Sequence, residues 1–150
     1  MQTPLTEEVD VMNGHRKTIL IAEDHESNRT LLALLLEQAE YDVHLAADGI
    51  EALEEMTRTA FDAVITDWDM PRMNGLEFLA HSRVDWPETP VIVVSAHALD
   101  PGEEKGLKEA FALVQKPFES NQLLQLLQSA IQQSSRRGSD HNTTMPTRGE

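Results

Sequence analysis

Cysteine is absent from this 150-residue sequence, which excludes disulfide-stapled scaffolds and zinc sites built on thiolates. Positive charge is scarce, because 12 Lys and Arg stand against 26 Asp and Glu, and the formal net charge is -14. This acid excess repels phosphate backbones and anionic lipid heads, so no direct contact with nucleic acid or membrane is expected. The sequence also lacks an apolar run of roughly 20 residues and an N-terminal secretory signal. These absences predict a soluble protein of the cytoplasm.

The two ends of the chain lack the apolar periodicity that the middle shows. Residues 1–16 are expected to form an N-terminal tail. Residues 134–150, a polar mixture with Gly138, Pro146 and Gly149, are expected to form a flexible C-terminal tail. Residues 17–133 remain as one folded domain, long enough to bury a core without disulfides or a structural metal.

Short apolar runs alternate with amphipathic stretches in this domain, at intervals of about 20 to 25 residues that are typical of strand-helix repeats. The first, third and fourth runs are continuously apolar, as strands covered on both faces must be. The second run alternates, which indicates a half-exposed edge strand. The pattern predicts an α/β fold with a parallel sheet. Its five strands are expected at 18–22, 43–47, 63–66, 91–94 and 112–115.

Helical signals fill the intervening stretches. Residues 100–103 combine a capping Asp, a Pro for the first turn and a Glu at the capping-box position, so a helix is expected to start near Pro101. Ser120 precedes an apolar stripe that predicts a capped final helix. The leucines of residues 31–36 predict the first helix in the same way.

Polar and charged side chains follow four of the five predicted strands. Glu23 and Asp24 end the first, Asp67 the third, Ser95 the fourth and Lys116 the fifth. Taken singly, such residues commonly cap helices or lie in solvent. Taken together they meet at the carboxyl edge of a parallel sheet, where ligands of open α/β sheets bind.

The chemistry of this set points to a cation and a phosphoryl group. Three crowded carboxylates repel one another unless a cation shares their site, and oxygen-only ligation suits Mg²⁺ better than zinc. A carboxylate nucleophile, a divalent ion, an ammonium and a hydroxyl are the parts that phosphoryl transfer requires.

Four segments of the sequence resemble the receiver domain of two-component response regulators. They are Ile-Leu-Ile-Ala-Glu23-Asp24-His, Val-Ile-Thr-Asp67-Trp-Asp-Met-Pro-Arg-Met-Asn-Gly, Val-Val-Ser95-Ala and Lys116-Pro-Phe, and the resemblance covers about residues 17 to 133. It implies a flavodoxin-like (βα)5 fold with a five-stranded parallel sheet in the order 2-1-3-4-5. It also implies that Asp67 accepts a phosphoryl group from a phosphohistidine in a phosphorelay.

The resemblance assigns a role to each residue of the set. Glu23, Asp24, Asp67 and the backbone carbonyl of Asp69 would hold Mg²⁺. Ser95 would be the switch hydroxyl, and Lys116 would pair with the phosphoryl group, with the Lys116-Pro117 bond in cis. The protein would not be a classical enzyme but a phosphoacceptor with self-catalysed transfer and autodephosphorylation.

The chain departs from the family pattern at the second switch position. Receivers usually carry Tyr or Phe three residues before the Lys, where this chain has Leu113. Phe111 lies two residues earlier and is expected to pack in the core. Glu40 and Glu109 stand at two helix-to-strand corners where the family favours Gly, so either they adopt a left-handed conformation or the helices end differently. Asp69 and His97 occupy positions that tune phosphoryl lifetime in the family.

The resemblance also names partners. Phosphorylation would shift the face of the helix near Pro101, the strand 112–115 and the final helix, and so alter binding to a downstream protein or allow a phosphorylation-dependent dimer. The stretch from Glu23 to Arg29 looks like receivers of hybrid sensor histidine kinases. In that case a histidine kinase or histidine phosphotransfer domain would dock on the first helix. A stand-alone receiver and a piece of a larger protein both remain open.

Two other interpretations compete with a working receiver. A pseudo-receiver would keep the fold as an interaction module that phosphate does not switch, and Leu113 is its only support. A haloacid-dehalogenase-type phosphatase also uses an Asp-x-Asp motif, here Asp67 and Asp69, but Pro71 stands where that family expects Thr or Val. Its acidic metal pair also follows the nucleophile, whereas Glu23 and Asp24 precede Asp67.

Overall fold

Five parallel strands form one sheet in the order β2-β1-β3-β4-β5 in the computed structural model, which describes residues 16–148. The order confirms the predicted topology. The strands are β1 (Thr18–Ala22), β2 (Asp42–Ala46), β3 (Ala63–Asp67), β4 (Val91–Ser95) and β5 (Ala112–Gln115). The helices between and after them are α2 (Glu26–Gln38), α3 (Gly49–Arg58), α4 (Gly75–Asp85), α5 (Pro101–Gly106) and α6 (Ser120–Arg148).

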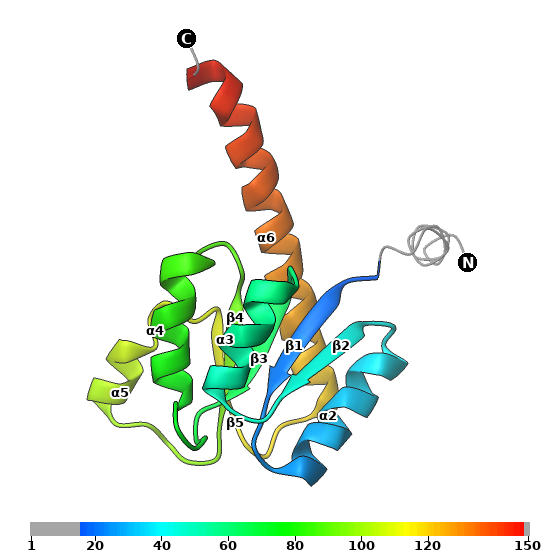
Figure 1. Ribbon diagram of the computed structural model, residues 1–150, viewed down its shortest axis with the longest axis vertical. Helices are drawn as coiled ribbons and strands as arrows, with labels where there is room; N and C mark the ends of the chain where they lie inside the picture. The colour runs from blue at the N-terminus through cyan, green and yellow to red at the C-terminus, as the bar shows by residue number, and fades with distance from the viewer. Residues whose placement is uncertain (1–15, 149–150) are drawn as a thin grey trace.

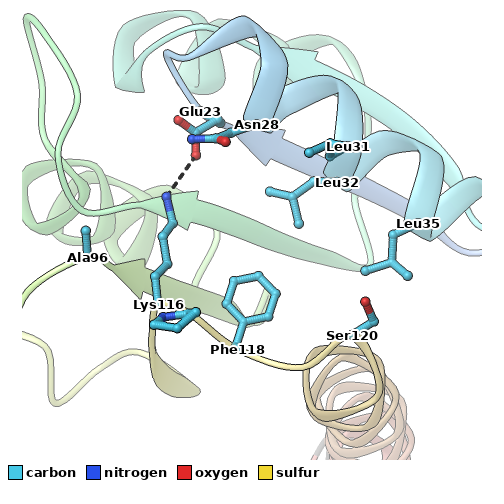
Figure 2. A pocket seen from close by; sticks show the side chains of 10 residues that line it. Glu23, Asn28, Leu31, Leu32, Leu35, Ala96, Lys116, Phe118 and Ser120 are labelled. Carbon is cyan, nitrogen blue, oxygen red and sulfur yellow. Dashed lines mark ion pairs between the residues drawn. The ribbon is translucent and has the colours of Figure 1, made fainter.

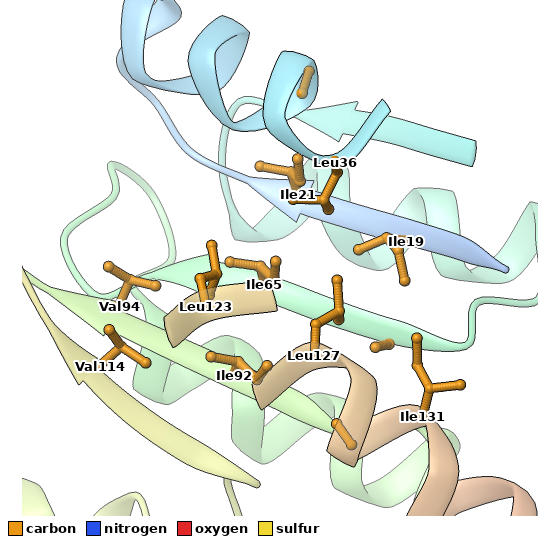
Figure 3. Packing of buried hydrophobic residues seen from close by; sticks show 13 residues of the cluster. Ile19, Ile21, Leu36, Ile65, Ile92, Val94, Val114, Leu123, Leu127 and Ile131 are labelled. Atoms are coloured by element: carbon orange, nitrogen blue, oxygen red, sulfur yellow. The ribbon is translucent and has the colours of Figure 1, made fainter. Parts of the chain in front are cut away.

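Helices cover both faces of the sheet (Figure 1), and apolar side chains form a cluster on each face. On one side, Leu36 of α2 and Leu123 and Leu127 of α6 pack on the strands, as Figure 3 shows. On the other, Phe78 and Leu79 of α4 pack with residues of α3 and the opposite strand faces. Burial on both faces is the reason that the apolar residues of β1, β3 and β4 are consecutive and do not alternate with polar ones.

The edge position predicted for the second strand is confirmed. β2 pairs with β1 alone, with Thr18 opposite Asp42, and most of its residues are partly or fully exposed. The exposed fraction of Leu45 is 45%. The alternating pattern therefore came from a strand that has solvent on one side.

Two helices begin with capping boxes. Asp100 Oδ1 accepts from the Glu103 N–H at 2.8 Å and Glu103 Oε1 accepts from the Asp100 N–H at 3.0 Å, which confirms the predicted start of α5 at Pro101. Asn74 and Glu77 form the same box at α4, which the sequence reasoning did not identify. The α4 box fixes the point where the loop after β3 turns into a helix.

The two helix-to-strand corners with Glu in place of Gly differ. Glu40 has φ 71° and adopts the left-handed conformation, with its N–H bonded to the Glu37 carbonyl. Glu109 does not, because Glu40 and Arg72 are the non-glycine residues with positive φ in the described chain. The corner before β5 therefore uses a different turn, in which the Ala110 N–H bonds to the Leu107 carbonyl.

The last helix is longer than the sequence suggested. A flexible tail was expected from residue 134, but α6 continues to Arg148 and extends away from the sheet in Figure 1. Helical hydrogen bonds are local, so a helix can continue past its last packed turn, here at Ala130 and Ile131. The N-terminal tail expected for 1–16 lies outside the described residues except for Arg16. Within residues 16–148, no helix is apolar over a stretch that could cross a membrane.

Candidate functional site

The carboxyl ends of four strands bring the predicted polar set to one edge of the sheet. Asp67 is the last residue of β3 and Ser95 the last of β4, while Glu23 and Lys116 directly follow β1 and β5. Parallel register places these ends side by side, because Ala22 pairs with Thr66, Asp67 with Val94 and Ser95 with Gln115. The residues are therefore neighbours although nearly a hundred positions separate the first from the last.

Lys116 lies between two carboxylates. Its Nζ is 3.4 Å from Asp67 Oδ1 and 3.5 Å from Glu23 Oε1, the ion pair drawn in Figure 2. Both carboxylates are buried, with residue exposures of 7% for Asp67 and 1% for Glu23. The Lys116-Pro117 bond is cis, as the resemblance implied. One cation thus faces two buried anions, which leaves negative charge uncompensated at the site.

The Asp67 carboxyl holds its proton more tightly than an ordinary aspartate does. Burial and the negative charge of Glu23 raise its pKa to about 6, and Lys116 only partly opposes this. A cation bound beside Asp67 would remove the penalty on its charged form. The electrostatics therefore favour a site that holds a metal ion.

Donor atoms suited to a hard cation are grouped at the start of the loop after β1. Ligand atoms of Glu23, Asp24 and His25 all lie within 4.8 Å of one another. Asp24 Oδ1 is buried and, in the described part of the chain, accepts no hydrogen bond. Arg29 holds this loop by donating from Nη1 to the Glu23 carbonyl oxygen at 2.8 Å. An oxygen-rich donor set with an unsatisfied carboxylate oxygen fits Mg²⁺.

Two features of this group were not foreseen. His25 belongs to it, with Nδ1 at 3.3 Å from Asp24 Oδ1 and 3.4 Å from Glu23 Oε2, and no spacing rule signals a histidine next to an acid pair. Asp67, which the sequence reasoning assigned to the metal, is not part of this group of described residues and pairs with Lys116 instead. The ligand roles of Asp67 and of the Asp69 carbonyl stay predictions.

The Ser95 hydroxyl is bonded within its own loop. Its Oγ donates to the His97 carbonyl oxygen at 2.7 Å and accepts from the His97 N–H at 3.2 Å. His97 Nδ1 lies 3.6 Å from Asp69 Oδ2, so the loops after β3 and β4 meet above the site. Movement of Ser95 toward Asp67 would require these two hydrogen bonds to break.

No aromatic side chain takes the place of Leu113 among the described residues near β5. Leu113 is 41% exposed at the edge of the sheet. Phe111 packs against the cluster beneath α2 and α6, as expected for a core residue, and so does not substitute for it. The position that the resemblance assigns to an aromatic switch residue therefore holds an exposed aliphatic side chain.

A groove of about 750 Å³ opens next to Lys116 and runs between α2 and the start of α6 (Figure 2). Its walls are mainly apolar. They include Leu31, Leu32 and Leu35 of α2 and Phe118 before α6, with Glu23 and Lys116 at one end. Leu31 is 65% exposed, so part of its apolar surface faces solvent at the groove. The apolar groove therefore leads directly to the polar site.

The sequence is similar to that of known proteins. A family model described as "Response regulator receiver domain" matches residues 19–128. Sensor protein EvgS of Escherichia coli K12 is 40% identical over 90 residues, which are 60% of this chain and 8% of that protein. The sensory/regulatory protein RpfC of Xanthomonas campestris pv. campestris is 38% identical over 117 residues, 73% of this chain and 16% of that protein. The chain therefore spans only a small part of these two relatives.

A solved structure agrees with the sequence relatives. The receiver domain of sensor histidine kinase PA1611 from Pseudomonas aeruginosa PAO1 superimposes with a TM-score of 0.71 at 30% identity, covering 77% of this chain and 98% of that structure. A magnesium ion is coordinated in the active site cleft of that receiver.

Proposed function

The chain belongs to the response regulator receiver family of two-component signalling, and from this membership we propose that it accepts a phosphoryl group from a phosphohistidine onto Asp67. The observation that carries the proposal is the placement of Asp67 at the end of β3, buried and within 3.4 Å of Lys116. A nucleophilic carboxylate paired with Lys116, which itself lines one end of an apolar groove, is suited to attack a phosphoryl group that a protein partner presents.

The transfer would exchange one bond for another. An Asp67 oxygen forms a bond to phosphorus as the bond from phosphorus to the histidine nitrogen breaks, and the imidazole leaves with the electron pair. Lys116 stabilises the added negative charge on the phosphoryl oxygens. Mg²⁺, when held by Glu23, Asp24, Asp67 and the Asp69 carbonyl, supplies the remaining positive charge. Hydrolysis by water then restores the free carboxylate, with the chain as a phosphoacceptor and not a classical enzyme.

The response is a change in a binding face. The phosphoryl group offers acceptor oxygens to the Ser95 hydroxyl, which exchanges its bond with the His97 carbonyl for one with phosphate. The loop after β4 leads into α5, so the face made by α5, β5 and α6 shifts its population of conformations. A downstream protein, or a second phosphorylated copy of the chain, would bind this face in the cytoplasm.

The phosphodonor would dock beside α2. Leu31 is exposed and lines the groove that ends at Lys116 and Glu23, so an apolar helix lying there would bring its histidine toward Asp67. EvgS is named a sensor protein and RpfC a sensory/regulatory protein, and both contain a segment similar to this chain. A histidine kinase or histidine phosphotransfer domain is therefore the proposed donor.

Trp68 offers a direct test, because it follows Asp67 and is 6% exposed. With Mg²⁺ present, beryllofluoride or a small phosphodonor should change its fluorescence, and Asp67→Asn or EDTA should abolish the change. A radiolabelled phosphotransfer assay with Asp67→Asn as the control gives the second readout. A pseudo-receiver predicts no response in the intact protein, and that result would refute the proposal. The phosphatase alternative is not favoured, since the receiver model covers residues 19–128.

A further inference from the structure

The loop of residues 68–74 carries Asp69 and is anchored at its base. It joins β3 to α4, and the Gly75 N–H donates to the Trp68 carbonyl oxygen at 2.9 Å, which closes the loop on itself. A Cβ on Gly75 would lie 2.6 Å from the Asp67 carbonyl oxygen, so the two ends of the loop are in direct backbone contact. The base of the loop is therefore closed by direct backbone contact.

The tip of the loop is bound to a different part of the fold. Arg72 donates from Nε at 2.8 Å and from Nη2 at 2.6 Å to Oδ2 of Asp48, the residue that caps α3. Asp48 is 5% exposed, and its other oxygen accepts from the Glu51 N–H at 2.9 Å. Burial raises the pKa of Asp48, but the Glu51 and Arg72 hydrogen bonds outweigh it and lower the pKa, so the carboxylate is charged.

The backbone of the loop is shaped for this contact. Arg72 has φ 67°, a left-handed conformation that costs free energy for a residue other than glycine. Beside it, Met73 packs so closely on Gly49 at the start of α3 that a Cβ on Gly49 would lie 2.8 Å from Met73 Cγ. Two contacts thus join the loop tip to the first turn of α3, and Asp69 lies between this tip and the closed base.

We propose that Asp48 and Arg72 are positioning residues, whose ion pair holds the 68–74 loop in the orientation in which the Asp69 backbone carbonyl can bind Mg²⁺. The inference rests on the proposed function. It assigns a role to two residues that touch neither the metal nor the phosphoryl group and lie 24 positions apart. Residues that orient metal ligands in this way typically change metal affinity by about 10-fold or more when they are replaced.

Two substitutions separate positioning from simple electrostatics. Arg72→Asn removes a positive charge near a cation site but keeps a residue that tolerates the left-handed conformation. Asp48→Asn removes a negative charge but keeps a good helix cap. Charge alone predicts tighter Mg²⁺ binding for Arg72→Asn and weaker binding for Asp48→Asn. Loss of the positioning contact predicts about 10-fold weaker Mg²⁺ binding for both, and for the double variant as well, because one contact is lost in each case.

The control is Arg58→Asn, which breaks the exposed ion pair between Arg58 and Glu55 at 2.6 Å with the same change of charge. Mg²⁺ affinity is measured by isothermal titration calorimetry on the full chain, with circular dichroism to show that each variant is folded. Arg58→Asn should bind Mg²⁺ as the wild type does.

Unchanged or tighter Mg²⁺ binding by Arg72→Asn overturns the inference, and so do additive losses in the double variant. The Arg72→Asn result decides the matter even if Asp48→Asn fails to fold, because Arg72 lies at the surface with 55% of its side chain exposed. Failure of the wild type itself to bind Mg²⁺ would refute the proposed function, and the inference would fall with it.

Discussion

At the scale of single residues, the site is organised by charge that the fold does not neutralise. Asp67 and Glu23 are both buried, and Lys116 is placed between them. This arrangement costs stability in the absence of a metal ion, because a buried carboxylate must lose its proton next to another anion. This loss of stability falls on Asp67, the residue whose carboxylate would be the nucleophile in the proposed reaction.

The raised pKa of Asp67 predicts a dependence of stability on pH. Its pKa is about 6 in the folded protein, against 3.8 for an ordinary aspartate. The folded state therefore binds this proton more tightly than the unfolded state does. The stabilisation that protonated Asp67 contributes is present below about pH 4 and is lost as the pH rises through 6. In EDTA at pH 7.5, Asp67→Asn should raise the free energy of unfolding by about 1–2 kcal/mol, after allowance for solvent screening in the site.

Urea unfolding at pH 7.5 and pH 4 measures this effect. The gain should be much smaller at pH 4, where Asp67 is protonated in the folded state and, with an ordinary pKa of 3.8, partly protonated in the unfolded state. Glu88→Gln, on the exposed loop before β4, provides a control that should change stability by less than about 0.5 kcal/mol at both pH values. An equal gain at pH 4 and pH 7.5 would show that the charge of Asp67 is not the cause.

At the scale of elements, close backbone approach fixes the loop between β3 and α4. Gly75 is the first residue of α4, and nothing larger fits against the end of β3. Gly102, near the start of α5, has no such constraint, because its nearest neighbour for a Cβ is Asp100 Oδ1 at 3.4 Å. The two glycines thus occupy similar helix positions, but only Gly102 has room for a Cβ atom.

Replacing each glycine by alanine should therefore have opposite effects. Gly75→Ala forces the backbone of Asp67 and Trp68 apart and should lower the free energy of unfolding by about 1–3 kcal/mol. Gly102→Ala should leave it unchanged or raise it by about 0.5 kcal/mol, because alanine is the better helix former. Thermal and urea unfolding in EDTA provide the measurement. Equal stability of the two variants would contradict the steric explanation.

At the scale of the whole molecule, apolar surface serves both the core and the groove. Leu127 of α6 is fully buried against the sheet, whereas Leu31 of α2 is 65% exposed beside the site. Helix α2 also buries Leu36 beneath it, so one helix contributes to both surfaces. Stability and docking can therefore be altered separately by substitutions on the two sides of the same layer.

This separation predicts two distinct phenotypes. Leu127→Ala should lower the free energy of unfolding by about 2–5 kcal/mol through the cavity that it leaves. Leu31→Ala should change stability by less than about 0.5 kcal/mol, but should slow phosphorylation by a phosphotransfer domain while phosphorylation by a small phosphodonor stays unchanged. Phosphotransfer kinetics with both donors provide the test. If Leu31→Ala slowed phosphorylation by the two donors equally, the groove would not be the docking site.

The sequence by itself determined the sheet, the order of its elements and the residue types at the strand ends. Strands buried on two faces must be apolar, and polar residues at their carboxyl ends must meet at one edge. The start of α5 followed from the local hydrogen bonds of residues 100–103.

The tertiary structure alone decided which of these residues touch. The pairing of Asp48 with Arg72, the position of His25 beside the acid pair and the groove along α2 are contacts between side chains with no fixed sequence spacing. Such contacts depend on how loops and helices pack, whereas apolar periodicity reports only which face of an element is buried. The end of α6 at Arg148 was also not predicted, because the residues past 134 carry no apolar periodicity from which a helix could be inferred.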